Sequence, residues 1–120
     1  MSGDRSKWIA ELNDRFRVAL GISQLCGGIP GQCLLTCGIA DLDKVLKAEV
    51  LDTVRSFSVF EEGNDPYGEH DFGAFDIEGV GKVFWNIDYY ENTQCLYGAE
   101  HPENLTQSYR VLTIMLAEEY

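Results

Sequence analysis

Apolar residues recur at intervals of three and four along the first twenty positions, which is the pattern of an amphipathic helix. The apolar stripe consists of Trp8, Ile9, Leu12, Phe16, Ala19 and Leu20. It predicts a helix from about Arg5 to Leu20, with Arg15 and Arg17 left in solvent. Gly21 favours a helix stop, and the glycine-rich segment GISQLCGGIPGQ that begins there is expected to form a loop.

Two further elements are predicted between residues 33 and 57. The run CLLTCGI, residues 33–39, contains β-capable residues between Gly31 and Asp41, so we interpret it as a buried strand. Helical spacing then returns in Leu42, Leu46, Val50, Val54 and Phe57. We therefore expect a second helix from about Lys44 to Phe57, with Asp43 as its N-cap.

The segment FGAFDIEGVGKVFWNIDYY, residues 72–90, shows the alternation of a β-hairpin. Phe75 and Ile77 are expected on one face and Asp76 and Glu78 on the other, with a turn over residues 79–81. The alternation resumes with Val83, Trp85 and Ile87. The following loop, ENTQCLYGAEHPEN, has a candidate short third segment near residues 95–97.

We interpret the C-terminal apolar run as a third helix that ends at the chain terminus. The run contains Val111, Leu112, Ile114, Met115 and Leu116. Thr106 or Ser108 is the expected cap of this helix.

The predicted order is helix, strand, helix, strand, strand, helix. This order indicates an α+β fold with a small, mainly antiparallel sheet of about three strands backed by three helices. At 120 residues the chain has the length of one domain, so we expect residues 1–120 to form a single domain. The hairpin strands should pair directly, whereas the pattern does not place the first strand in the sheet.

The net charge of -11 is distributed unevenly along the chain. Residues 1–60 hold seven acidic and seven basic side chains, whereas residues 61–120 hold thirteen acidic side chains against only Lys82 and Arg110. The sum over the second half is therefore 2 − 13 = −11. Such a surface disfavours direct binding to DNA or RNA, whose phosphates require lysine and arginine. It would instead attract a basic protein surface.

No apolar run approaches the roughly 20 residues needed to span a bilayer, and MSGDRSKW lacks the apolar stretch of a signal peptide. We therefore expect a cytoplasmic protein without a membrane partner. Cysteines stay reduced in that compartment. Cys26, Cys33, Cys37 and Cys95 are accordingly interpreted as small buried apolar side chains rather than as disulfides or zinc ligands.

The segment NDPYGEHDFG, residues 64–73, combines turn chemistry with three adjacent ionisable residues. In an extended chain Glu69 and Asp71 share one face and His70 points to the other. With Asp88 these carboxylates would form an oxygen-rich site for magnesium or manganese, and His70 or His101 would be the general base. The alternative is structural: His70 and Asp71 tie the turn to the sheet, and Glu69 is solvated.

Other catalytic signals are weak. The sequence has no phosphate-binding loop, no GxSxG elbow and no HExxH zinc helix, and Cys33 and Cys37 have no adjacent base. The aromatic side chains of FWNIDYYEN are expected in the core and the sheet, because a base-stacking platform needs basic neighbours. Tyrosines beside carboxylates also suit a protein interface.

Several segments resemble a small bacterial family of unknown function that is found largely in proteobacteria, on plasmids, prophages and other mobile elements. The segments are NDPYGEHDFGAF, FWNIDYY, RVLTIMLAEEY and LNDRFR. The likeness covers residues 54–120 and the first helix. Because mobile elements carry small acidic proteins that block host defence, the resemblance implies an inhibitor of the anti-CRISPR or anti-restriction type.

We therefore expect a non-enzymatic acidic protein without a cofactor or metal ion, which imitates the charge of DNA and occupies a basic groove of a host nucleic-acid-handling complex. The binding residues predicted to provide the negative electrostatic field are Glu61, Glu62, Asp65, Glu69, Asp71, Asp76, Glu78, Glu91, Glu100 and Glu103. The alternative is a metal-dependent hydrolase that uses the Glu69-His70-Asp71 cluster.

Overall fold

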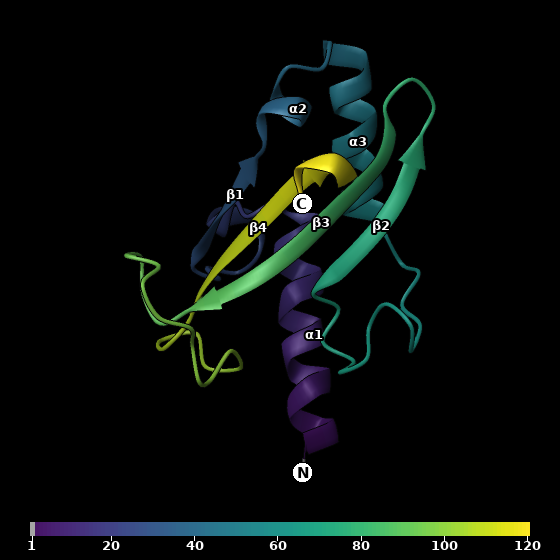
Figure 1. Ribbon diagram of the computed structural model, residues 1–120. Helices are drawn as coiled ribbons and strands as arrows, with labels where there is room; N and C mark the ends of the chain where they lie inside the picture. The colour runs from purple at the N-terminus through teal and green to yellow at the C-terminus, as the bar shows by residue number, and fades with distance from the viewer. Residues whose placement is uncertain (1) are drawn as a thin grey trace.

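Four strands form one mixed sheet in the computed structural model, which describes residues 2–120. The elements are α1 (Ser2–Val18), β1 (Gly31–Leu35), α2 (Cys37–Ala40), α3 (Lys44–Ser56), β2 (Phe72–Ile77), β3 (Gly81–Tyr90) and β4 (Tyr109–Leu116), with short 3-10 turns η1 (Ser23–Leu25) and η2 (Ala117–Glu119). The strand order is β1-β4-β3-β2 (Figure 1). β1 runs parallel to β4, and the other neighbouring pairs are antiparallel.

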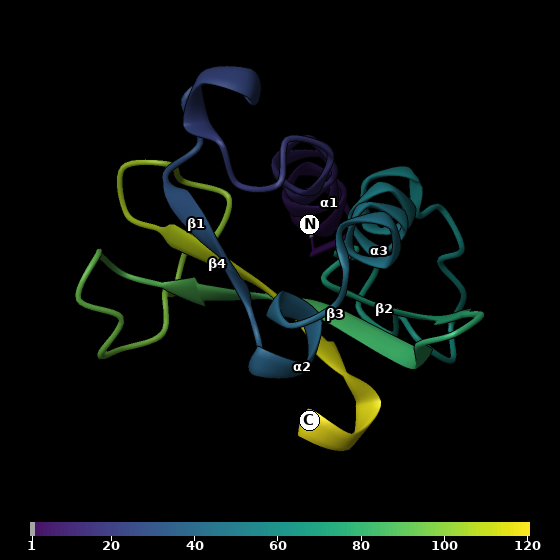
Figure 2. The same cartoon turned by 90° about the horizontal axis from the view of Figure 1, so that it is seen from above.

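The two long helices lie on one face of this sheet. Figure 2 shows α1 and α3 side by side above the strands, whereas η2 and the C-terminus lie on the opposite side. The core fills the space between the helices and the sheet, where Phe16, Val54 and Trp85 have no solvent exposure. This architecture confirms a mixed α+β fold with three helices, and it contains four strands instead of about three.

The first two predicted helices and the hairpin are confirmed. The N-cap of α3 is Asp43, whose carboxylate accepts a hydrogen bond from the Leu46 amide at 2.9 Å. The hairpin pairs Phe75 with Val83, and its turn is closed by Gly79 and Gly81, whose φ angles of 87° and 104° favour glycine.

The C-terminal run is a strand, so the predicted third helix is wrong. β4 is a central strand between β1 and β3, and it has apolar side chains on both faces. Leu112 and Ile114 pack toward the core, while Val111 and Met115 are buried on the other face. A strand covered on both sides loses the alternation of apolar and polar residues, so a short apolar run resembles a buried helix.

The predicted caps of that helix make local loop contacts instead. The Ser108 hydroxyl donates to the Asn104 carbonyl at 2.8 Å, and the Thr106 hydroxyl donates to the Asn104 side chain at 2.7 Å. The candidate segment near residues 95–97 forms no strand, and the nearest pairing is a single bridge between Tyr90 and Gly98.

The first strand also differs from its predicted range. It covers Gly31–Leu35, and residues 37–40 form the short helix α2. Its pairing with the middle of β4, which places Cys33 opposite Leu112, fixes the strand that the sequence left unplaced. Gly31 allows this pairing, because a Cβ there would collide with the Arg110 carbonyl and the Phe16 ring.

A single carboxylate holds the C-terminal turn against the rest of the fold. Glu119 accepts hydrogen bonds from the Thr36 hydroxyl at 2.6 Å, the Gly38 amide at 2.9 Å and the Leu116 amide at 3.0 Å. These donors lower the pKa of Glu119, the Thr36 hydroxyl most of all. Beyond this clamp, the Tyr120 ring meets the Phe84 ring edge-on at 5.6 Å.

We expect Glu119→Gln to lower the melting temperature near neutral pH. Because the folded state lowers the pKa of Glu119, its contribution is present above the ordinary glutamate pKa of about 4.3 and is lost as the pH falls below it. Wild type and variant should therefore converge in strong acid. Thermal unfolding from pH 7 down to about pH 2 measures this, with Glu118→Gln as the matched control, and a constant difference at every pH contradicts it.

Candidate functional site

A buried amide joins α1 to the sheet and to the loop before β2. The Asn13 side chain is fully buried and donates to the Tyr89 hydroxyl at 2.7 Å and to the Glu69 carbonyl at 2.9 Å. Its Oδ1 accepts from Nε of Arg110 at 2.7 Å. Asn13 thereby uses both of its donor hydrogens and its acceptor, as a buried amide must.

Tyr89 and Glu69 extend this network toward solvent. The Tyr89 hydroxyl donates to the Glu69 carboxylate at 2.8 Å. Burial, followed by the negative charge of Glu69, raises the pKa of Tyr89 far above its ordinary value. The phenol therefore stays neutral and acts as a hydrogen-bond donor, which makes it unsuitable as a nucleophile or a base.

Arg110 is the fully buried cation of this network. Its guanidinium lies over the Tyr89 ring, 5.2 Å from the centroid, and donates to the Pro102 carbonyl at 2.8 Å. Burial lowers the pKa of Arg110, while Tyr89 and Glu69 act in the opposite direction. These contacts tie the loop of residues 91–108 to α1 and β4.

A second network forms around His70. The His70 backbone has a φ of 56°, and its amide donates to the Asp65 carboxylate at 3.0 Å. Nδ1 of the ring lies 3.0 Å from the Asp14 carboxylate and Nε2 lies 3.6 Å from that of Asp65. The ring stacks on Phe60 with centroids 3.8 Å apart. Both ring nitrogens therefore face carboxylates of the protein itself.

Arg17 completes the second network and corrects the prediction that it lies in solvent. Its side chain is 4% exposed and donates to the carbonyls of Val54 and Phe57, both at 3.0 Å, at the C-terminal end of α3. A third bond of 3.0 Å reaches the Asp14 carboxylate. Because the last carbonyls of a helix have no internal donors, Arg17 caps α3 and joins it to α1. Arg15 is exposed as predicted, although it also donates to the Cys26 carbonyl.

The carboxylates of NDPYGEHDFG lie close enough to influence one another electrostatically. Burial, and then the negative charge of Glu69, raises the pKa of Asp71, and Asp65 and Asp88 contribute in the same direction. Asp88 itself is exposed and accepts a hydrogen bond from Asn86 at 3.1 Å. Even so, no group of three or more His, Cys, Asp or Glu side chains among residues 2–120 is arranged to hold a metal ion.

These contacts do not favour the metal-hydrolase alternative. They also differ in part from the structural alternative, in which His70 and Asp71 tie the turn to the sheet and Glu69 is solvated. The carboxylates of Asp14 and Asp65 occupy the position from which His70 would take a substrate proton. The other candidate base, His101, lies in the loop after β3, 3.4 Å from Glu103. The turn is tied to α1 through the His70 side chain, and Glu69 is engaged by Tyr89.

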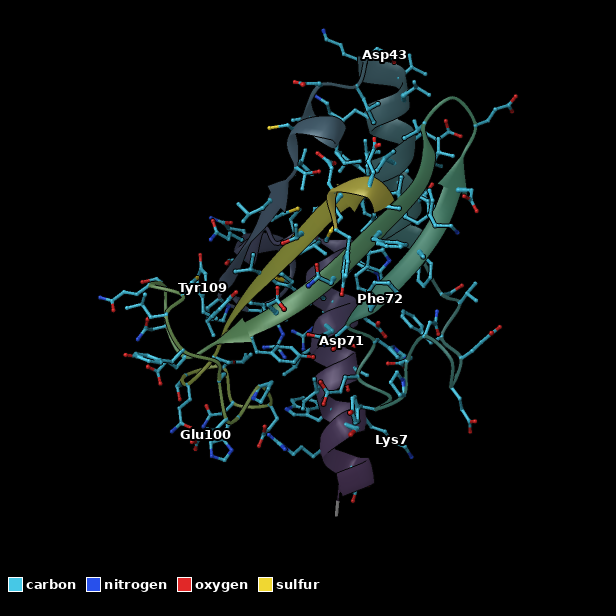
Figure 3. The ribbon with its side chains drawn as sticks, in the orientation of Figure 1. Lys7, Asp43, Asp71, Phe72, Glu100 and Tyr109 are labelled. Atoms are coloured by element: carbon cyan, nitrogen blue, oxygen red, sulfur yellow. The ribbon has the colours of Figure 1, made fainter. Side chains whose placement is uncertain are left out.

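The ten predicted binding residues occupy three separate parts of the surface (Figure 1). Glu61, Glu62, Asp65, Glu69 and Asp71 lie in the segment between α3 and β2; Asp76 and Glu78 lie at the hairpin turn; and Glu91, Glu100 and Glu103 lie in the loop after β3. Figure 3 shows Glu100 far from Asp71. The ten predicted binding residues therefore do not form one continuous patch.

Solvent access further divides these ten residues. Asp65 is only 8% exposed, and Glu69 and Asp71 are half-buried. Asp76 pairs with Lys82 at 3.5 Å and Glu103 pairs with Arg5 at 3.0 Å. The remaining five are exposed and make no ion pair with the described residues: Glu61, Glu62, Glu78, Glu91 and Glu100.

Two of these exposed carboxylates share a polar cleft of about 530 Å³ in the loop after β3. Glu91 and Glu100 line it together with His101. The loop is fastened to α1, because Arg5 donates to the Glu100 carbonyl and the Trp8 indole donates to the Glu103 carbonyl.

The cysteines only partly match the prediction. Cys26 is buried and Cys33 is half-buried, and burial raises the pKa of the Cys33 thiol to about 11. Cys37 is exposed, because it begins the short helix α2 instead of lying in a strand.

Sequence reasoning missed Asn13, Arg17 and Arg110. Asn13 and Arg17 directly follow the stripe residues Leu12 and Phe16, four positions apart, so they lie along the margin of the buried face. Arg110 adjoins the apolar run of β4. A polar residue in or beside an apolar pattern was the available signal in all three cases.

The sequence matches the family described as protein of unknown function (DUF3768) over residues 35–119, and the chain belongs to this family. No curated protein and no solved structure matches the chain. Across residues 2–120, each helix is too short or too polar to cross a membrane.

We expect Tyr89→Phe to lower the free energy of unfolding by about 2 kcal/mol, because it leaves an Asn13 donor and the Glu69 carboxylate without their partner. Urea denaturation measures this loss. Tyr90→Phe removes a hydroxyl from the neighbouring residue, which makes no side-chain hydrogen bond to the described residues, and should change the free energy little. Equal effects of the two substitutions would contradict the network.

His70→Ala should also destabilise the fold, by about 1 to 2 kcal/mol after allowance for its partial exposure. The variant loses the stack on Phe60 and the contacts with Asp14 and Asp65. His101→Ala is the control, because that side chain is 54% exposed. Unchanged stability of His70→Ala would contradict this structural role of the histidine.

Proposed function

We propose that the protein is a non-enzymatic binding protein that engages a basic surface of another protein through the carboxylates of residues 61–120. The observation that carries this proposal is that most of their charge is not neutralised within the fold. Of the two basic residues in this half, Arg110 is fully buried and Lys82 is paired with Asp76. Among the described residues, one carboxylate of this half, Glu103, pairs with a lysine or arginine of the first half.

The positions of the exposed carboxylates support this role. Glu61 and Glu62 lie in the segment before β2, and Glu91 and Glu100 lie in the loop after β3. Both segments lie at the end of the molecule where α1 begins (Figure 1). A negative field from two flanking loops steers a positively charged partner toward that end.

The engagement of the titratable groups supports a binding role over catalysis. A general base or nucleophile needs an atom that is free to meet a substrate. His70 faces two carboxylates, and the Tyr89 hydroxyl is bonded to Asn13 and Glu69. These side chains stabilise the fold in their observed positions.

The partner that we propose is a basic, nucleic-acid-binding groove in a host defence complex of the CRISPR or restriction type. A groove that accepts phosphates presents lysine and arginine, which also bind carboxylates, so a DNA mimic can occupy it. The resemblance to a family carried on plasmids and prophages supports this choice. Such an inhibitor would be encoded by a mobile element and would act in the cytoplasm without a cofactor.

Capture of partners from a bacterial lysate at two salt concentrations tests the proposal. Association should weaken strongly between about 0.1 M and about 1 M salt, where the Debye length falls from about 10 Å to about 3 Å. Mass spectrometry identifies the captured proteins. Capture that is unaffected by salt, or that yields no basic protein, would contradict the proposed mode of binding.

A matched pair of variants locates the charge that matters. Glu91→Gln with Glu100→Gln should reduce capture, because both carboxylates line the polar cleft. Asp41→Asn with Glu49→Gln removes the same charge from exposed positions in the first half and should leave capture unchanged.

A further inference from the structure

We propose that the open face of the sheet, opposite α1 and α3, docks an apolar segment flanked by lysine or arginine on the basic partner. This inference rests on the proposed function and names the surface that gives it specificity. The helices cover only one side of the sheet, and η2 with Tyr120 turns back over part of the other (Figures 1 and 2). The rest of that side is free of helices.

The register defines what this face presents. One cross-strand row runs over all four strands as Leu34, Thr113, Asn86 and Phe72. The adjacent row contains Phe84 and Ala74, together with Met115, which is buried. Leu34 is 46% exposed. The rings of Phe72 and Phe84 lie 5.5 Å apart, and both are partly exposed. An apolar centre with aromatic side chains is typical of a protein-binding surface.

The charges on this face determine which occupant fits. Asp88 lies beside the apolar rows, is exposed and accepts a hydrogen bond from Asn86. No lysine, arginine or histidine among residues 2–120 lies within ion-pair distance of it. Lys82, the cation of this face, is already paired with Asp76. An occupant that covers Asp88 removes its carboxylate from water, so a partner that supplies a cation there is favoured.

A second copy of the chain fits this requirement poorly. It would add another net charge of -11 and another unpaired Asp88, while its own Lys82 is already engaged. Like charges brought together at an interface oppose association. A partner with lysine or arginine beside its apolar residues complements both the apolar rows of the face and the unpaired Asp88.

Backbone NMR of the full chain tests the surface with two defined probes. The first is a short synthetic peptide that alternates leucine with lysine, and the second alternates leucine with glutamate. We expect the cationic peptide to shift amide signals of residues 34, 72–74, 84–88 and 111–115, and the anionic peptide to shift none of them. Asp88→Lys should raise the Kd of the cationic peptide about tenfold, because an attractive pair becomes repulsive.

Glu49→Lys is the matched control, since it makes the same charge change at an exposed position of α3, which lies on the other side of the sheet, and should alter the Kd little. Leu34→Gln provides a second variant that removes apolar surface at an exposed position and should also weaken binding. Equal effects of Asp88→Lys and Glu49→Lys, or equal binding of both peptides, would overturn the inference.

Two outcomes separate this inference from the proposed function. Shifts confined to the loops of residues 57–71 and 91–107 would overturn the docking face and leave an acidic binding protein standing. Failure of the cationic peptide to bind would also overturn the docking face. The lysate capture does not depend on this peptide, so its result decides the proposed function separately.

Discussion

The attachment of α1 to the sheet depends on the buried side chain of Asn13. A buried amide that lost one partner would retain an unsatisfied polar group, at a cost of roughly 1 to 3 kcal/mol. Asn13 avoids this cost by bonding Tyr89 on β3, Arg110 on β4 and the Glu69 carbonyl in one place. These directional bonds set the position of α1 in a way that apolar packing alone does not, because hydrophobic contacts are non-directional.

This network also shapes the surface charge. Burial of Arg110 removes one of the two basic residues of the second half from solvent. At the same time the fold uses Asp65 and Glu69 internally, as partners of His70 and Tyr89. The carboxylates of the NDPYGEHDFG segment thus mainly stabilise the structure, and the charge available to a partner comes from other acidic residues, such as Glu61 and Glu91.

The sequence predicted those elements that keep one face in solvent. α1, α3 and the β2–β3 hairpin retain the contrast between apolar and polar positions, so their periods could be read directly. β4 is covered on both faces and lost this contrast, which made a strand resemble a helix. The proximity of Glu69 and Asp71 was predictable because they are neighbours in sequence. The network around Asn13 was not predictable, since Asn13 lies 56 positions from its partner Glu69 and 97 positions from its partner Arg110.

The open sheet face follows from the same arrangement. Two helices on one side bury the inward rows of the sheet and leave the outward rows to the C-terminal turn, which is shorter than the strands it crosses. Because this turn reaches Phe84 but is fastened through Glu119, the boundary between covered and open surface depends on one carboxylate. Phe72 and Leu34 lie in the row next to that of Phe84, where apolar area, an unpaired Asp88 and the remaining acidic surface are all accessible to one partner.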